Sequence, residues 1–155
     1  FDIIFLDGLH EWRQTYRDLA NSLNHLNSGG EVLLDDVVLD DEGSALPDQN
    51  VTRQERERRG IRSRTWHGDV YKVLLALNSL ESQVDFCVIG NPNDDNVQAL
   101  IWKMPGFNSL EASDDQLVRF DACDYRSTFP KGKIPQIFRW MTEVEGINLA
   151  LSSAK

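Results

Sequence analysis

Two short apolar runs that flank one amphipathic helix constrain the fold of this chain more than any other feature. The first run, FDIIFL at residues 1–6, contains β-branched residues and predicts a buried parallel strand that is covered on both faces. Apolar side chains then recur at steps of three and four over about residues 10–26, as on one face of a helix. Gly29-Gly30 ends this pattern, and the second run, EVLL at residues 31–34, follows. Strand, helix and strand in this order form the crossover unit of a parallel sheet.

The remaining elements extend this plan to an α/β fold. Asp69 is predicted to cap a second helix, which begins at the sequence VYKVLLALNSL. Residues 84–90 and 97–103 predict two strands joined by a tight turn, and therefore an antiparallel hairpin. The C-terminal extension, residues 104–155, carries one further predicted helix near residues 135–151.

Residues 39–65 are predicted to form a charged surface insertion. The stretch begins acidic and rich in turn residues (LDDEGSALPDQN), and continues strongly charged and mostly basic (RQERERRGIRSR). One short exposed helix is expected within it. A solvated loop and a lid beside a binding site are both consistent with this composition.

Acidic residues follow both strands of the crossover unit. Asp7 comes after the first strand, and Asp35 and Asp36 come after the second. Ligands of parallel α/β sheets bind beyond the carboxyl ends of the strands, so neighbouring strands would bring these carboxylates together. Carboxylates repel one another unless a cation lies between them, and Mg²⁺ and Ca²⁺ take oxygen ligands. The residues therefore predict a divalent-metal site; the alternative is that Asp35 or Asp36 caps a loop and Asp7 faces water.

Histidines near these acids are candidates for proton transfer. His10 lies three residues after Asp7, on the first turn of the predicted helix. A neutral imidazole at this place could accept the proton of a substrate hydroxyl, whereas the alternative is a surface or capping role. His67, which follows Trp66 just before a helix, stays ambiguous between site and core, and His25 is predicted to be structural.

Composition limits the partners and the compartment. The 155 residues suit one domain over 1–155, and 25 acidic against 16 basic side chains give a net charge of −9. This balance argues against nucleic acid as a partner and against a polybasic membrane anchor. No apolar run approaches the roughly 20 residues of a transmembrane helix, and the first residues lack the basic region of a signal peptide. Cys87 and Cys123 cannot form a disulfide framework, so a reducing cytoplasm is the expected compartment.

Four motifs in residues 1–103 carry a family resemblance. A strand ends in FLDG with a histidine three residues after the aspartate, an amphipathic helix ends at Gly-Gly, and the next strand ends in Asp-Asp; the fourth motif is WHGDVYK at residues 66–72. Together they resemble the C-terminal half of a class I S-adenosylmethionine-dependent methyltransferase, and more narrowly the metal-dependent O-methyltransferases. The resemblance implies a Rossmann-like sheet whose strands here correspond to family strands 4, 5, 6 and 7. Their spatial order would be 4-5-7-6, with the last hairpin strand antiparallel and with flanking helices.

The resemblance also implies a chemistry. It implies S-adenosylmethionine as the cofactor and Mg²⁺, or another divalent cation, bound by Asp7, Asp35 and Asp36. His10 would act as the general base, and the acceptor would be a small hydroxylated molecule.

One part of the family pattern has no counterpart in this sequence. Strands 1 to 3 and the glycine-rich loop that holds the cofactor are missing, so cofactor-binding residues are not assigned. We expect the chain to be part of a longer methyltransferase and to be inactive by itself. The alternatives are a homodimer that covers the open sheet edge, or a non-catalytic remnant that serves as an assembly module. A metal-dependent hydrolase is less favoured, because the C-terminal extension offers no obvious nucleophile or phosphate-binding loop.

Overall fold

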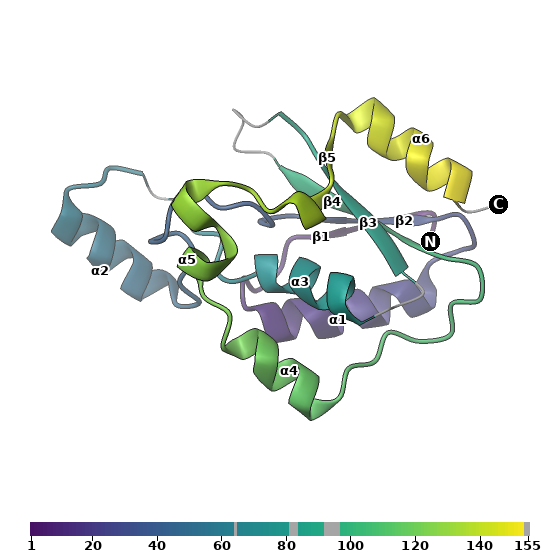
Figure 1. The fold of residues 1–155 in the computed structure, drawn as a ribbon, viewed down its shortest axis with the longest axis horizontal. Helices are drawn as coiled ribbons and strands as arrows, with labels where there is room; N and C mark the ends of the chain where they lie inside the picture. Colours follow the sequence, from purple (N-terminus) through teal and green to yellow (C-terminus); the bar gives the residue numbers. More distant parts are fainter. Residues whose placement is uncertain (64, 81–83, 92–96, 154–155) are drawn as a thin grey trace.

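The fold is built on an open sheet with helices on both faces. The structure is a computed structural model that describes residues 1–63, 65–80, 84–91 and 97–153. Within these residues, five strands form a mixed sheet in the order β1-β2-β4-β3-β5. Figure 1 shows α1 and α3 on one face of this sheet and α6 on the other. The architecture is therefore α/β, as the sequence predicts.

The bounds of the elements are as follows. The strands are β1 (Ile3–Leu6), β2 (Glu31–Leu34), β3 (Val84–Ile89), β4 (Gln98–Lys103) and β5 (Trp140–Met141). The helices are α1 (Trp12–His25), α2 (Gln49–Arg59), α3 (Tyr71–Ser79), α4 (Asp114–Asp121), α5 (Tyr125–Thr128) and α6 (Glu143–Ser153), with single 3₁₀ turns at Pro130–Gly132 and Gln136–Phe138. None of these helices has both the length and the apolar composition that a membrane crossing requires.

The pairing of the four predicted strands agrees with the expected order. β1 and β2 run parallel, and Leu6 lies opposite Leu34 at their carboxyl ends. β3 and β4 form the predicted antiparallel hairpin, and β4 lies between β2 and β3. β5, which the sequence pattern does not predict, pairs in parallel with β3 at the far edge, with Val88 opposite Trp140.

Two hydrophobic clusters pack on opposite faces of the sheet, because successive side chains of a strand point to opposite sides. Val84, Phe86 and Val88 of β3 belong to the larger cluster, which includes side chains of α1 and α3. Cys87 and Ile89 belong to the smaller cluster, which includes Ala150 of α6. Burying each large apolar side chain stabilises the fold by about 1.5–3 kcal/mol. The sheet is thus fixed from both sides in the region of β3 and β4.

β1 is not covered on both faces, and this part of the prediction is wrong. Phe1, Ile3 and Phe5 are 71%, 65% and 53% exposed, whereas Ile4 and Leu6 pack against the core. β1 is parallel to its neighbour, but it is an edge strand, and no described element packs over its outer face. A continuous apolar run therefore indicates a strand here without indicating burial of both its faces.

The helix predicted near residues 135–151 is wrong in its first half. Phe138 is fully buried at the end of a 3₁₀ turn, and Arg139 adopts a left-handed conformation (φ 45°), so the chain leaves the helical course and forms β5. α6 starts only after Thr142. The hydroxyl of Thr142 accepts the backbone N–H of Glu145 (3.3 Å), and the Glu145 carboxylate accepts the backbone N–H of Thr142 (2.9 Å). This capping box is the sequence signal that marks the true helix start.

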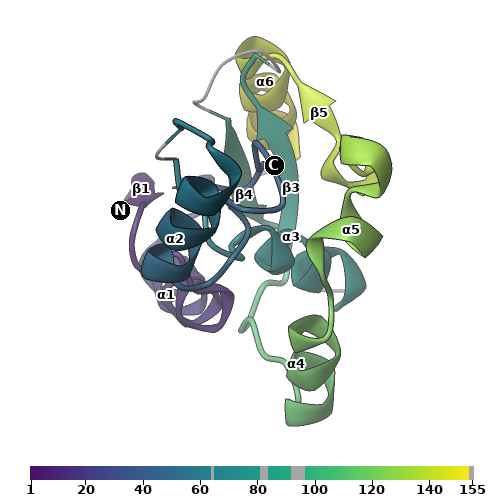
Figure 2. The same cartoon turned by 90° about the vertical axis from the view of Figure 1, so that its left-hand side faces the viewer.

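The charged stretch 39–65 contains the expected short helix. α2 begins after Asp48, whose carboxylate accepts the backbone N–H groups of Asn50 and Val51, and it ends at Gly60 in the left-handed conformation. α2 projects at one side of the molecule in Figure 1, and Figure 2 shows α4 and α6 at opposite ends.

Candidate functional site

The carboxyl ends of β1 and β2 place acidic side chains at one edge of the sheet. The parallel ladder continues one step past Leu6, whose carbonyl accepts the backbone N–H of Asp35 at 3.0 Å. The next residue, Asp36, adopts a left-handed backbone conformation with φ of 60°. Aspartate tolerates this conformation better than most residues do. The chain thereby turns at Asp36, and this residue, together with Asp7 after β1, lies at the end of the parallel pair.

Asp7, His10 and Asp36 form one compact group. His10 Nε2 lies 3.0 Å from a carboxylate oxygen of Asp36 and 3.5 Å from one of Asp7. One ligand atom from each of the three residues lies within 4.8 Å of the other two. Two carboxylates and one imidazole nitrogen at this spacing are a donor set that a divalent cation can share.

Hydrogen bonding fixes the orientation of the His10 ring. Its Nδ1 lies 2.9 Å from the backbone carbonyl oxygen of Trp66, and a carbonyl only accepts, so Nδ1 carries the hydrogen. The ring also stacks on the Trp66 indole, with centroids 4.6 Å apart and planes inclined by 25°. In the neutral imidazole, Nε2 then presents its lone pair toward the carboxylates of Asp7 and Asp36. A proton on Nε2 or a cation between these groups is needed to make this arrangement favourable.

The segment 66–69 holds the backbone of His10 in place. Gly68 has φ of 62°, and a methyl group at this position would overlap the carbonyl oxygen of His10. The backbone N–H of Asp69 donates to the same carbonyl at 3.3 Å. One carboxylate oxygen of Asp69 accepts the backbone N–H of Trp12 at 2.8 Å, in the first turn of α1. Asp69 therefore holds the chain at the His10 carbonyl and again at Trp12, two residues further on.

This arrangement corrects the predicted capping role of Asp69. Val70 occupies the N-cap position of α3 and makes no side-chain cap hydrogen bond. The Asp69 side chain instead contributes to the start of α1 and forms a buried ion pair with Lys72 at 3.0 Å. The reason is spatial: α1 and α3 are packed together, so Asp69 meets the free N–H groups of the neighbouring helix.

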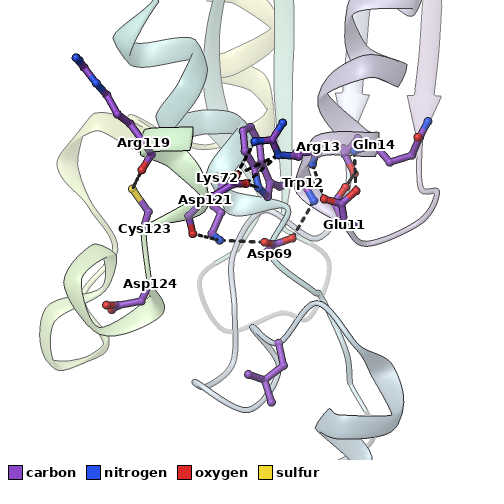
Figure 3. A network of polar contacts seen from close by, with 12 residues as sticks. Glu11, Trp12, Arg13, Gln14, Asp69, Lys72, Arg119, Asp121, Cys123 and Asp124 are labelled. Atoms are coloured by element: carbon purple, nitrogen blue, oxygen red, sulfur yellow. Dashed lines mark hydrogen bonds and ion pairs between the residues drawn. The ribbon is translucent and has the colours of Figure 1, made fainter. Parts of the chain in front are cut away.

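A polar network connects the start of α1 and Lys72 to the C-terminal extension (Figure 3). The indole Nε1 of Trp12 and the guanidinium of Arg13 both donate to the carboxylate of Asp121 in α4, Nε1 at 2.9 Å. Lys72 Nζ donates to the Asp121 backbone carbonyl at 3.3 Å. The hydrogen bond from Arg13 is the main reason that the pKa of Asp121 lies below its usual range.

Burial and a second histidine set the electrostatics of Asp36. Desolvation raises the pKa of the Asp36 carboxyl above its usual value, while His10 and His67 act in the opposite direction. His67 is buried, and its Nε2 lies 3.8 Å from Asp36 Oδ1. Its backbone N–H donates to the carbonyl of Ser44, and within the described part of the chain its Nδ1 has no hydrogen-bond partner. His67 is thus a neighbour of Asp36 within the protein interior.

The structure brings together only part of the predicted set. Asp7, Asp36 and His10 meet, whereas Asp35 does not belong to the group that could share a cation. Trp66 and His67 border the site although the sequence alone left them unassigned. The sequence signal for these two residues is the WHGD motif. Its glycine, Gly68, is required because the backbone at this position closely approaches His10.

Comparison with known proteins adds no relative to this picture. No protein-family model, no curated protein and no solved structure matches the chain.

Proposed function

We propose that this protein is an S-adenosylmethionine-dependent, divalent-metal-assisted O-methyltransferase that acts on a small hydroxylated substrate. The convergence of Asp7, His10 and Asp36 at the carboxyl ends of two parallel neighbouring strands carries the proposal. The motifs that resemble metal-dependent O-methyltransferases lie at these same positions. The strand order β1-β2-β4-β3 also supports a correspondence with strands 4, 5, 7 and 6 of that fold.

The two carboxylates of this group fit a hard divalent cation such as Mg²⁺. The carboxylates of Asp7 and Asp36 would hold it, and Mg²⁺ commonly keeps several water molecules besides one or two carboxylates. Asp7 is half exposed and Asp36 is only 16% exposed, so the group is open to solvent on one side. When bound, the cation would lower the pKa of a substrate hydroxyl.

His10 supplies the basic atom of the proposed site. Its Nδ1–H donates to the Trp66 carbonyl, which leaves Nε2 facing the carboxylates of Asp36 and Asp7 that would hold the cation. Nε2 accepts the hydroxyl proton, and the carboxylate of Asp36 at 3.0 Å stabilises the imidazolium that results. Stacking on Trp66 keeps the ring from rotating.

The residues of this chain do not fit S-adenosylmethionine in the same way. The sequence contains no glycine-rich loop between a strand and a helix. No residue of this chain is therefore assigned to this cofactor.

Calorimetric titration with MgCl₂ tests the metal site first. We expect wild-type binding, and at least about tenfold weaker binding by Asp7→Asn and Asp36→Asn, because each loses a charged oxygen ligand. Asp115→Asn, which removes an exposed carboxylate in α4, is the matched control and should bind like the wild type. Unchanged Mg²⁺ affinity of Asp36→Asn would remove the basis of the proposal.

A second titration tests the cofactor. S-adenosylhomocysteine is added to the chain before and after saturation with Mg²⁺. Heat of binding would support methyl transfer and a cofactor site completed by this chain or by a second copy. Mg²⁺ binding without any response to S-adenosylhomocysteine would place the cofactor site outside this chain.

One observation favours the non-catalytic alternative, an assembly module. The apolar side chains Phe1, Ile3 and Phe5 are exposed on the edge strand β1, and exposed edge strands pair readily with other strands. Sedimentation equilibrium distinguishes the alternatives. A tight dimer that binds neither Mg²⁺ nor S-adenosylhomocysteine would favour the assembly module over the enzyme.

A further inference from the structure

A pocket of about 520 Å³ lies between α2 and the segment that leads to the WHGD motif. The side chains that matter most in its lining are Thr52, Arg53, Arg56, Ile61, Arg62 and Trp66. Its size matches a small organic molecule, for which pockets of roughly 300–1,000 Å³ are typical. Ile61 and Trp66 contribute apolar surface, and the arginines contribute charge.

The pocket is basic although the protein as a whole is acidic. Among the residues that the structure describes, Arg53, Arg56 and Arg62 line it together with a single acid, Glu57. Arg56 already pairs with Asp41 outside the lining, at 3.1 Å, so its charge is largely balanced. Arg53 and Arg62 are exposed, and no ion pair to a carboxylate occupies either of them among the described residues. In a chain with a net charge of −9, such a concentration of guanidinium groups favours an anionic ligand.

Two buried polar atoms beside the pocket lack partners. Arg56 and Thr52 are 3% and 2% exposed, and neither Arg56 Nε nor Thr52 Oγ1 has a hydrogen-bond partner within the described part of the chain. Leaving a buried donor unpaired is unfavourable. The other nitrogens of Arg56 are held by Asp41 and by Thr65 (3.2 Å), so this guanidinium is fixed in advance of binding.

Trp66 joins the pocket to the candidate site. Its indole lines the pocket and also stacks on His10, and its Nε1 donates to the Leu46 carbonyl at 2.7 Å. The indole ring of Trp66 is therefore held rigidly between the pocket and His10. A ligand in the pocket lies against the same residue whose carbonyl orients His10.

We propose that this pocket binds the methyl acceptor, and that the acceptor is a small hydroxylated molecule with an anionic oxygen group, a carboxylate or a phosphate ester. Arg53 and Arg62 recognise the anionic group, and Ile61 and Trp66 contact its carbon skeleton. The identification of the ligand as the acceptor rests on the proposed function, whereas the preference for an anion rests on the pocket alone.

A matched pair of probes tests the anion preference without any metal. 4-Hydroxybenzoate and 4-hydroxybenzamide have nearly the same shape and differ in charge, and ligand-observed NMR measures the dissociation constant of each. We expect the benzoate to bind about tenfold more tightly, and added NaCl to reduce the difference. Equal affinities, or no binding of either probe together with no binding of phenyl phosphate, would overturn the proposal. If phenyl phosphate binds more tightly than the benzoate, the anionic group of the ligand is identified as a phosphate ester rather than a carboxylate.

Variants locate the binding to the pocket. Arg53→Gln combined with Arg62→Gln should reduce benzoate affinity to that of the benzamide, and both positions are exposed, so the fold should persist. Arg59→Gln is the control, because Arg59 belongs to the same helix, pairs with Glu55 and does not line the pocket. A loss of affinity in Arg59→Gln equal to that of the double variant would refute the location.

The imidazole NMR signals separate this proposal from the proposed function. The benzoate should shift the ring resonances of His10 and leave those of His25, which lies at the end of α1, unchanged. Anion-selective binding that leaves His10 unmoved would overturn the assignment of the ligand as the acceptor. Binding that moves His10 in a protein without Mg²⁺ affinity would instead sustain the pocket and reject the metal-assisted mechanism.

Discussion

Replacing Gly68 with alanine measures how firmly the segment 66–69 holds His10. Gly68 is in the left-handed region, where a residue with a side chain costs about 1–2 kcal/mol. The added methyl group would overlap the His10 carbonyl oxygen and lie 2.7 Å from His10 Cβ, so the two segments must separate. Separation breaks the Asp69 N–H hydrogen bond to His10, worth about 1 kcal/mol, and loosens the Asp69 cap on Trp12, worth about the same. We therefore expect the free energy of unfolding to fall by about 3–4 kcal/mol.

Gly60→Ala is the matched control for this experiment. Gly60 has φ of 69°, almost the same as Gly68, but no atom of the described residues lies within 4 Å of an added methyl group. We expect a loss of only about 1–2 kcal/mol, from the backbone conformation alone. Urea unfolding of both variants, followed by tryptophan fluorescence and by circular dichroism, gives the comparison. If Gly68→Ala loses no more stability than Gly60→Ala, the close approach to His10 does not stabilise the protein as argued.

Three further predictions concern charge, metal and thiol chemistry. The folded-state pKa of Asp121 is lowered, chiefly by Arg13, so the charged carboxylate stabilises the fold above the unfolded pKa of 3.8, and this stabilisation is lost as the pH falls through the lowered pKa. In urea unfolding at pH 7, Asp121→Asn should therefore be less stable than the wild type. The difference in unfolding free energy between the two proteins should close on acidification. Because Mg²⁺ prefers oxygen ligands, His10→Ala should change the Mg²⁺ affinity measured by calorimetry by less than about threefold. A loss of about tenfold would show that His10 is a metal ligand rather than a base. Burial raises the pKa of Cys87 to about 11, so a thiol reagent should label Cys123 in the folded protein and Cys87 only after unfolding. Rapid labelling of Cys87 in the folded Cys123→Ser variant would contradict the buried position of Cys87.

The sequence predicts the central fold because the signals there are local. A strand, a helix of one apolar face and a second strand follow one another closely, and the right-handed crossover leaves one arrangement for them. Once β1 and β2 are parallel neighbours, residues just after each strand must meet. The meeting of Asp7 and Asp36 therefore follows from topology, and so does the nearness of His10 to both.

The features that the sequence does not predict depend on contacts between residues that are far apart in the chain. Asp35 and Asp36 are equivalent in the sequence, and the left-handed turn at Asp36 decides which of them joins Asp7. The partner of His10 Nδ1 lies 56 positions away, on Trp66, so no local pattern indicates it. β5 is two residues long and exists through its pairing with β3, a constraint that no periodicity within the C-terminal extension reveals.

The network around Trp12 also sets an order of events in folding. Its indole hydrogen bond to Asp121 joins residues 109 positions apart, and the Asp69 cap on its backbone spans 57. The entropy lost on closing a chain loop grows with loop length, and folding slows as contacts become more distant in sequence. The unit of β1, α1 and β2 can thus form early from nearby residues, while the start of α1, next to His10, gains its last restraints only when α4 docks. During refolding, the proposed cation binding should consequently appear after most of the secondary structure has formed.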